Sequence, residues 1–518
     1  MTFVAWILAV ILVSFLILHR KLKAAVNPEP LPPGPAPLPI LGNVRDLTAK
    51  ELWLVAHKWA KQFGDVVYVH ILGQGLVFLN SPEATMDLLE RKGNIYADKP
   101  AFVMAGELCG CDNMVAFTRY GDVSKRQRRL INQAFGVQVI PSYHPLMQTE
   151  ARSLIRRLVT DPTNYMADTR RYAGGLTLSV VYGYEASGHN DKFLSLGEEC
   201  VDLLSNKIAS GGGIWPVDVF PSLKHLPPWA PGSGFLRKAA QWKTRMEEFV
   251  NQPYNFVKAS LETGNYVPSF CSMLLEDEER RSSPHFEFDL KHTANSMYSG
   301  SMDTTITMFS HFLLAMVLHP EVLATAQKEI DSVVGLDRLP TFCDRASLPF
   351  VDAVVSETYR WAVPVPLGMF ICLPHRLMED DVYRGMFIPK GSLVFGNIWA
   401  ITRDETLFPN ASAFIPERYL EKVDPALARK RDPRRYVFGF GRRRCPGGDL
   451  VESSVWILIT SVLATLDISK AKDTSGNPVE PRVHYNNSVF RLPDRFECNI
   501  RARSESALRL LQQAQSAE

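Results

Sequence analysis

The segment from Phe438 to Gly447 constrains the fold of this chain more than any other. It reads Phe-Gly-Phe-Gly-Arg-Arg-Arg-Cys-Pro-Gly and precedes a strongly apolar run that predicts a buried helix. Cys445 is therefore expected in a glycine-rich loop at a helix N-terminus, where the dipole and free amides favour the thiolate. The glycines let the backbone approach something flat and bulky. The pattern indicates a metal ligand or a nucleophile, and a nucleophile would need a histidine nearby in space.

The other cysteines and the charge balance exclude several classes. Eight cysteines in 518 residues form no CxxC pair, and Cys109-Gly-Cys111 lacks a second cluster to complete a zinc site. We expect most of them to be reduced, buried thiols in a cytosolic setting. The net charge of +2 gives no indication of nucleic acid as a partner.

The N-terminus predicts a membrane anchor. Residues 2–18 are apolar except for Thr2 and Ser14, and basic residues follow the run rather than precede it. This order disfavours a cleaved signal peptide and places the bulk of the chain in the cytosol. We therefore expect a single-pass anchor over residues 1–23, in contact with membrane lipid, and a stiff proline-rich connector over 24–43.

After the connector, helical patterns dominate over short strands. Strand-like runs lie at 66–71, 77–79, 382–388 and 393–397, and helix-like runs at 83–91, 124–135, 149–159, 235–261, 290–318, 320–334, 348–361 and 446–466. The run 290–318 is apolar nearly all round, which predicts a buried central helix. The chain is thus expected to be mainly α with minor β.

The pattern F-x-x-G-x-R-x-C-x-G is filled at every fixed position and resembles the heme-binding loop of the cytochrome P450 family. The resemblance implies that Cys445 ligates the iron of heme b (iron protoporphyrin IX), within a loop that includes Gly441 and Gly447. It also implies that Phe438 packs beside the thiolate and that Arg443 meets a heme propionate. The fold implied is a triangular α-helical prism with small sheets, preceded by one N-terminal transmembrane helix.

A second resemblance concerns charged residues away from the loop. Glu357-Thr-Tyr-Arg360 looks like the family's E-x-x-R motif, whose two ends share one face of a helix. Alone it is weak, since such pairs are common on surfaces. It precedes Phe414-Ile-Pro-Glu-Arg418-Tyr, which is similar to the family's P-E-R-F element. The resemblance implies a buried structural network of Glu357, Arg360 and Arg418.

A third resemblance lies in the long apolar run, at Gly300-Ser-Met-Asp-Thr304. By itself this is a polar notch that bends a helix. Together with the other motifs it resembles the family's oxygen-activating groove. Gly300 would leave room over the iron, Thr304 would hydrogen-bond the oxygen being activated, and Asp303 would relay protons. Ser301 stands where the family usually has a second glycine.

Two expected heme contacts depart from the family pattern. Residues 120–129 resemble its W-x-x-x-R helix, with Arg128 in the propionate-pairing slot but Ser124 in place of the tryptophan. Losing the indole removes a hydrogen bond and packing. His375 is the third expected propionate contact, but the preceding segment is longer than expected around Met369–Cys372. That insertion is either a pocket feature or a splice artefact.

The resemblance implies a monooxygenase that oxidises a lipophilic small molecule with O2 and electrons from NADPH–cytochrome P450 reductase. The expected substrate pocket contains Phe102, Met104, Met297, Gly300, Val365 and Phe490. Segments 215–222 and 380–385 look similar to fungal members that tailor secondary metabolites, which favours a terpenoid-like substrate. Basic residues around the heme loops either form a solvated surface or dock the reductase; they are Lys125, Arg126, Arg129, Arg434, Arg435, Arg442 and Arg444.

The expected organisation is therefore one heme-thiolate monooxygenase domain over 44–503 and a C-terminal tail over 504–518, held at the endoplasmic reticulum membrane and facing the cytosol. Three alternatives stay open: a peroxide isomerase or dehydratase of the same fold, a non-catalytic heme-binding membrane protein, and an anchored binding protein without heme.

Overall fold

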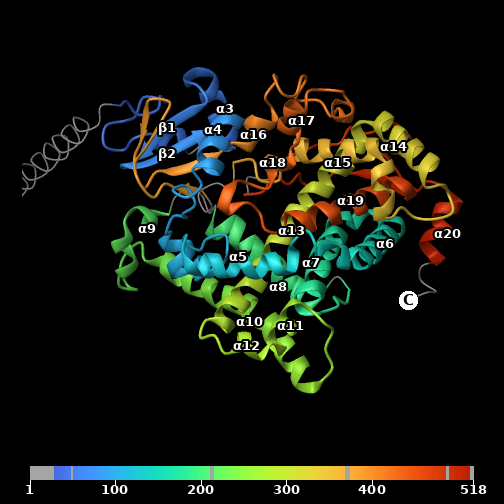
Figure 1. Cartoon of the computed structure of the whole chain (residues 1–518), viewed down its shortest axis with the longest axis horizontal. Coiled ribbons are helices and arrows are strands. Elements are labelled where there is room, and N and C mark those ends of the chain that lie inside the picture. The colour runs from blue at the N-terminus through green and yellow to red at the C-terminus, as the bar shows by residue number, and fades with distance from the viewer. Residues whose placement is uncertain are drawn as a thin grey trace, which may run out of the picture.

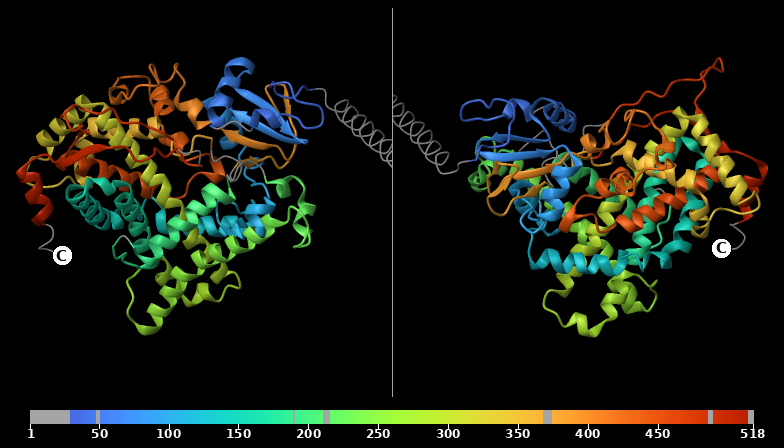
Figure 2. Two further views of the ribbon diagram at one scale, coloured as in Figure 1. Left: turned by 180° about the vertical axis from the view of Figure 1, so that it is seen from behind. Right: turned by 45° about the horizontal axis from the view of Figure 1, so that its top comes forward.

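The computed structural model describes residues 29–47, 51–188, 190–209, 215–367, 374–485 and 489–513. The expected anchor over 1–23 and the segment Met369–Cys372 lie outside these residues. Within the described part the chain is mainly helical with small sheets, as predicted, and β1 and β2 lie on the opposite side of the molecule from α6, α14 and α20 (Figure 1, Figure 2).

The main sheet has the order β1-β2-β6-β3. β1 (Val66–Ile71) and β2 (Gln74–Leu79) are antiparallel, β6 (Leu393–Gly396) runs parallel to β2, and β3 (His375–Arg376) is antiparallel to β6. Two further pairs are β4 (Asp381–Tyr383) with β5 (Met386–Ile388), and β7 (Leu466–Lys470) with β8 (Cys498–Ala502).

The helices, in chain order, are α2 (Val44–Leu47), α3 (Leu52–Phe63), α4 (Pro82–Thr85), α5 (Asp122–Phe135), α6 (His144–Thr160), α7 (Tyr165–Tyr182), α8 (Lys192–Asp202), α9 (Pro216–Val219), α10 (Gly234–Thr263), α11 (Phe270–Glu276), α12 (Glu278–Arg281), α13 (Phe286–Leu318), α14 (Pro320–Val333), α15 (Pro349–Ala362), α16 (Ile398–Thr402), α17 (Pro425–Arg431), α18 (Arg434–Val437), α19 (Gly448–Thr465) and α20 (Glu505–Gln513). Short 3-10 and π-helical segments lie between these helices, including the π-helix η1 (Met86–Arg91) directly after α4.

The long apolar run forms α13, which crosses the middle of the molecule and packs against α5, α7, α15 and α19 (Figure 1). Among the described helices, α13 and α19 are long and apolar enough to cross a membrane. Both are mostly covered by the rest of the protein, with 83% and 72% of their apolar windows buried. They are therefore core helices, and they place the residues around Gly300 and the loop before α19 in the interior.

Local sequence explains where two expected elements differ. The strand-like run 382–388 is a hairpin, because Arg384 and Gly385 both adopt a left-handed backbone (φ of 52° and 73°) that turns β4 into β5. The run 83–91 divides into α4 and η1.

The ends of the described chain pack against the domain. The Pro33 carbonyl accepts a hydrogen bond from the Tyr68 amide, and the Pro30 carbonyl accepts one from the Phe387 amide. The second half of the proline-rich connector therefore lies along the sheets. In the C-terminal tail, α20 buries Leu511 and packs against α6 and α19.

Candidate functional site

The loop before α19 is held by its own backbone and by η1. The Cys445 amide donates to the Phe438 carbonyl (2.6 Å), which closes the loop. Gly441 has a φ of 52°, and a Cβ there would lie 2.2 Å from the Leu89 carbonyl oxygen. A side chain at this position would therefore collide with η1, so the loop requires glycine. The Phe438 ring packs on Tyr359 with centroids 5.5 Å apart.

Cys445 is left uncovered by the residues around it. The residue is exposed, although burial among protein atoms raises the pKa of its thiol. A hydrogen bond from the Gly447 amide and the positive charges of Arg128 and Arg444 act the other way and lower that pKa. A thiol that is left uncovered by its neighbours and yet removed from bulk water lines an enclosed space. The amide and the cations there favour the thiolate.

The polar notch of α13 also faces open space. Gly300 is exposed in the middle of an otherwise buried helix, and a Cβ added there would meet no atom within 4 Å. The Thr304 hydroxyl donates a hydrogen bond to the Gly300 carbonyl (3.0 Å), so this polar side chain is bonded to the backbone of its own helix. Burial raises the pKa of Asp303 to about 6. A group that can carry a proton thus lies on α13 three residues after the open position at Gly300.

Helix α5 connects these two regions. Arg126 forms an ion pair with Asp289 at the start of α13, and the Arg128 guanidinium donates to the Arg444 carbonyl of the cysteine loop (2.6 Å). One helix therefore fixes the loop and α13 relative to each other. An uncovered thiol in the cysteine loop and a bare stretch of helix at Gly300 are features that suit a flat, bulky cofactor.

A buried group of cations fits the acidic edge of that cofactor. Arg443 donates to the carbonyls of Ala97 and Thr118, while its Nη1 is buried without a hydrogen-bond partner among the described residues. Burial and the charge of Arg128 lower the pKa of Arg443 to about 10. Lys99 is only 6% exposed, and burial, then Arg443 and Arg128, hold its pKa well below the usual range. Cations that destabilise each other in this way attract carboxylates such as propionates.

His375 belongs to the same group. Burial and the neighbouring Lys99 lower the pKa of His375 to about 3, so its imidazole is neutral. Its Nδ1 lies 2.7 Å from the Tyr96 carbonyl oxygen, which leaves Nε2 for another partner. The structure thus brings together three residues that the sequence had suggested as propionate contacts, Arg128, Arg443 and His375. It adds Lys99, which the sequence analysis missed because no local pattern sets it apart from a solvated lysine.

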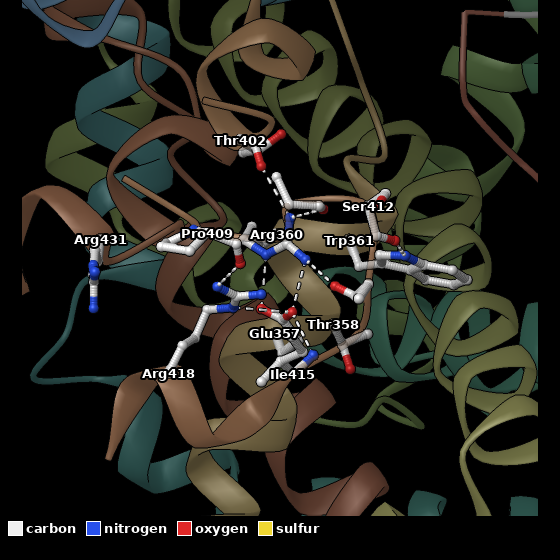
Figure 3. Close-up of polar contacts among 12 residues, drawn as sticks. Glu357, Thr358, Arg360, Trp361, Thr402, Pro409, Ser412, Ile415, Arg418 and Arg431 are labelled. Carbon is white, nitrogen blue, oxygen red and sulfur yellow. Dashed lines mark hydrogen bonds and ion pairs between the residues drawn. The ribbon is translucent and has the colours of Figure 1, made fainter. Parts of the chain in front are cut away.

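Figure 3 shows the network around Glu357, where Arg360 and Arg418 both point toward its carboxylate. Glu357 and Arg360 are fully buried and pair through two hydrogen bonds of 2.7 Å. Arg418 donates to Glu357 from the other side (3.3 Å), and the Ile415 amide donates to the same carboxylate (2.8 Å). The network ties α15 to the segment after α16.

The expected pocket residues fall largely in one apolar cluster. Met104 and Met297 are buried in it, and Phe102 and Phe490 pack against it half-buried. Val365 follows Pro364, whose carbonyl accepts a hydrogen bond from the Arg491 amide (2.9 Å). This bond brings the segment after Val489 next to the segment that contains Val365. Val363 adopts a left-handed φ of 42°, which is unusual for a β-branched residue. This conformation turns the chain from the end of α15 into the segment that contains Val365.

Comparisons with known proteins agree with this geometry. The family model described as cytochrome P450 matches residues 32–498. The chain is 38% identical to cytochrome P450 monooxygenase claT of Ampulloclitocybe clavipes, over 99% of this chain and 98% of the relative. It is 39% identical to cytochrome P450 monooxygenase 208 of Postia placenta, over 96% and 95%.

A further relative is cytochrome P450 monooxygenase claR of Ampulloclitocybe clavipes, 37% identical over 94% of this chain and 89% of the relative. The family match is continuous over residues 32–498 and includes the cysteine loop, the α13 notch and the Glu357 network. The chain therefore belongs to the cytochrome P450 family and is a P450 monooxygenase.

Proposed function

We propose that a hollow between the cysteine loop and α13 holds heme b, whose iron the Cys445 thiolate would bind. The observation that carries this proposal is the pairing of an enclosed but uncovered thiol with the bare stretch of helix at Gly300. When bound, a thiolate-ligated heme supplies dioxygen activation, because the thiolate pushes electron density toward O–O cleavage. Arg443, Arg128, Lys99 and His375 would hold its propionates.

Three residues of α13 would leave space for the reacting groups and deliver protons to them. Gly300 leaves the space that the reacting groups need, since any side chain would project into it. Asp303, with a pKa of about 6, can take a proton from water and release it near neutral pH, which an ordinary aspartate does far less readily. The Thr304 hydroxyl, which donates to the Gly300 carbonyl, would pass that proton on into the hollow.

Asp303→Asn is expected to slow product formation by roughly 100-fold or more, the range for a lost proton-transfer group. In the unchanged protein, turnover should fall as pH rises through about 6, because the carboxyl proton is then lost. The asparagine variant should lack that limb, and Asp303→Glu should retain it. Product formation is measured from pH 5 to 8 with saturating reductase. If the asparagine variant had the same rate and the same pH profile as the unchanged protein, Asp303 would not be the proton donor.

The surroundings of the hollow support a substrate class and an electron donor. Met104, Met297 and Phe490 belong to or pack against the apolar core, and such residues would suit a lipophilic molecule. The likeness of segments 215–222 and 380–385 to fungal members that tailor secondary metabolites favours a terpenoid. Electrons would come from NADPH–cytochrome P450 reductase docked on the basic face around α5, and residues 1–23 would hold the domain at the endoplasmic reticulum membrane as a single-pass anchor.

The test is turnover of a terpenoid panel by the full chain with reductase and NADPH under labelled dioxygen. Monooxygenation predicts one labelled oxygen atom in the product and strict dependence on NADPH. Conversion of added peroxides without NADPH, and no label from dioxygen, would instead identify the peroxide isomerase alternative. Heme with normal spectra and no oxygen consumption across the panel would favour a non-catalytic role.

A further inference from the structure

A buried hydrogen bond joins α13 to the segment that follows Val489. His311 is fully buried, Arg491 is 7% exposed, and a guanidinium nitrogen of Arg491 lies 2.9 Å from Nε2 of His311. Because arginine can only donate, this imidazole nitrogen must accept. The other ring nitrogen, Nδ1, lies 2.7 Å from the Thr307 carbonyl oxygen and carries the proton, since a carbonyl can only accept. The two partners therefore fix a neutral imidazole in a single tautomer.

The surroundings of the ring keep it neutral and immobile. Burial, and then the positive charges of Arg491 and Arg403, hold the pKa of His311 well below its usual range. The ring stacks on Tyr485 with centroids 5.7 Å apart and packs at 85° against Trp361. The imidazole is thus a fixed hydrogen-bond acceptor near neutral pH and does not carry protons.

Arg491 binds a second segment at the same time. The guanidinium nitrogen that contacts the imidazole also donates to the Ala362 carbonyl (3.1 Å), and the Arg491 amide donates to the Pro364 carbonyl (2.9 Å). The guanidinium lies 4.0 Å from the ring centroid of Tyr485 and 4.7 Å from that of Trp399. One buried side chain therefore fixes its own segment and the turn after α15 relative to α13.

The three segments that meet here carry residues of the expected substrate pocket. Val365 directly follows the segment that Arg491 binds, and Phe490 directly precedes Arg491. His311 lies on the same helix as the open position at Gly300. A shift of either segment away from α13 would therefore move Val365 or Phe490 relative to that open position.

We propose that His311 and Arg491 are positioning residues, whose hydrogen bond holds Val365 and Phe490 where they pack against a bound lipophilic ligand. This inference rests on the proposed function, because it takes the pocket to lie beside heme. Neither residue is among the proposed heme or pocket contacts, and both act through the segments that they hold. Without the imidazole, the buried guanidinium would lose an acceptor, and the segments would move to satisfy it.

Two ligands that bind heme iron through the same kind of azole nitrogen, imidazole and 4-phenylimidazole, test this role without turnover. They differ by one phenyl ring, so the ratio of their dissociation constants reports how well the pocket packs on that ring. His311→Leu removes the acceptor, and Arg491→Lys removes the fork of donors. Each should weaken binding of 4-phenylimidazole relative to imidazole about tenfold, the scale of one lost buried hydrogen bond.

Two further variants separate the hydrogen bond from other effects. His311→Gln should keep the ratio within about twofold of the unchanged protein, because its amide oxygen can still accept from Arg491. His144→Leu is the matched control: His144 also stacks on an aromatic ring, that of Phe342, but it lies at the start of α6, outside the pocket segments. The ratio should not change in this variant.

Soret difference spectra of the full-length, heme-loaded protein give both dissociation constants, and Arg491→Lys keeps the test valid if His311→Leu does not fold. An unchanged ratio, or an equal loss of affinity for both azoles, would overturn the positioning role. A shift as large in His311→Gln as in His311→Leu would show that the hydrogen bond is not the cause. If imidazole did not shift the Soret band of the unchanged protein at all, the proposed heme site itself would fail, and this inference with it.

Discussion

Arg360→Gln is expected to lower the free energy of unfolding by about 3–5 kcal/mol, the cost of breaking a buried ion pair. Arg360 is fully buried and donates two hydrogen bonds to Glu357 and three to the carbonyls of Thr402, Ala411 and Ala413. Glutamine cannot reach all of these groups. It would leave the Glu357 carboxylate with Arg418 as its remaining charged partner, and buried carbonyls without donors.

Arg280→Gln is the matched control, because Arg280 also pairs with an acidic residue three positions earlier. Its partner is Asp277 at 2.8 Å, but both side chains are about 40% exposed. The same chemical change should therefore cost no more than about 1 kcal/mol. Urea titrations followed by circular dichroism compare the two variants. Similar unfolding midpoints for both would show that the Glu357 network does not stabilise the fold.

Cys445→Ser is expected to reduce NADPH-dependent product formation to background. The thiolate is the proposed source of electron density for O–O cleavage, and an alcohol at this position is a far weaker donor. The loop itself should persist, since it is closed by the Cys445 amide and the Phe438 carbonyl rather than by the thiol. The loss should therefore appear without a change in circular dichroism.

Cys343→Ser provides the control for this loss. Cys343 is an exposed cysteine in the turn before α15, outside the proposed heme contacts. Its replacement should leave turnover at the level of the unchanged protein. Product formation by the two variants is measured with the same reductase preparation. Substantial turnover by Cys445→Ser would assign the reaction to another group.

The parts of the site that depend on local sequence could be predicted. Glycine spacing around Cys445 and the three-residue spacing of Glu357 and Arg360 are properties of single loops or helices, so residue order alone indicates them. The central helix α13 could be predicted because its apolar character continues all round.

The remaining features depend on contacts between distant segments. Lys99 meets Arg443 and His375 only after three separate segments come together, and no local pattern distinguishes it from a solvated lysine. The hydrogen bonds that the Pro30 and Pro33 carbonyls accept from the Phe387 and Tyr68 amides likewise need the folded partner.

The absorption spectrum of the reduced carbon monoxide adduct tests the central claim most directly. Thiolate ligation by Cys445 predicts a Soret band shifted to the red of that given by histidine-ligated heme proteins. Cys445→His should bind heme and lose that shift. A full-length protein that binds no heme, or that keeps the red-shifted band after Cys445 is replaced, would contradict the assignment of Cys445 as the iron ligand.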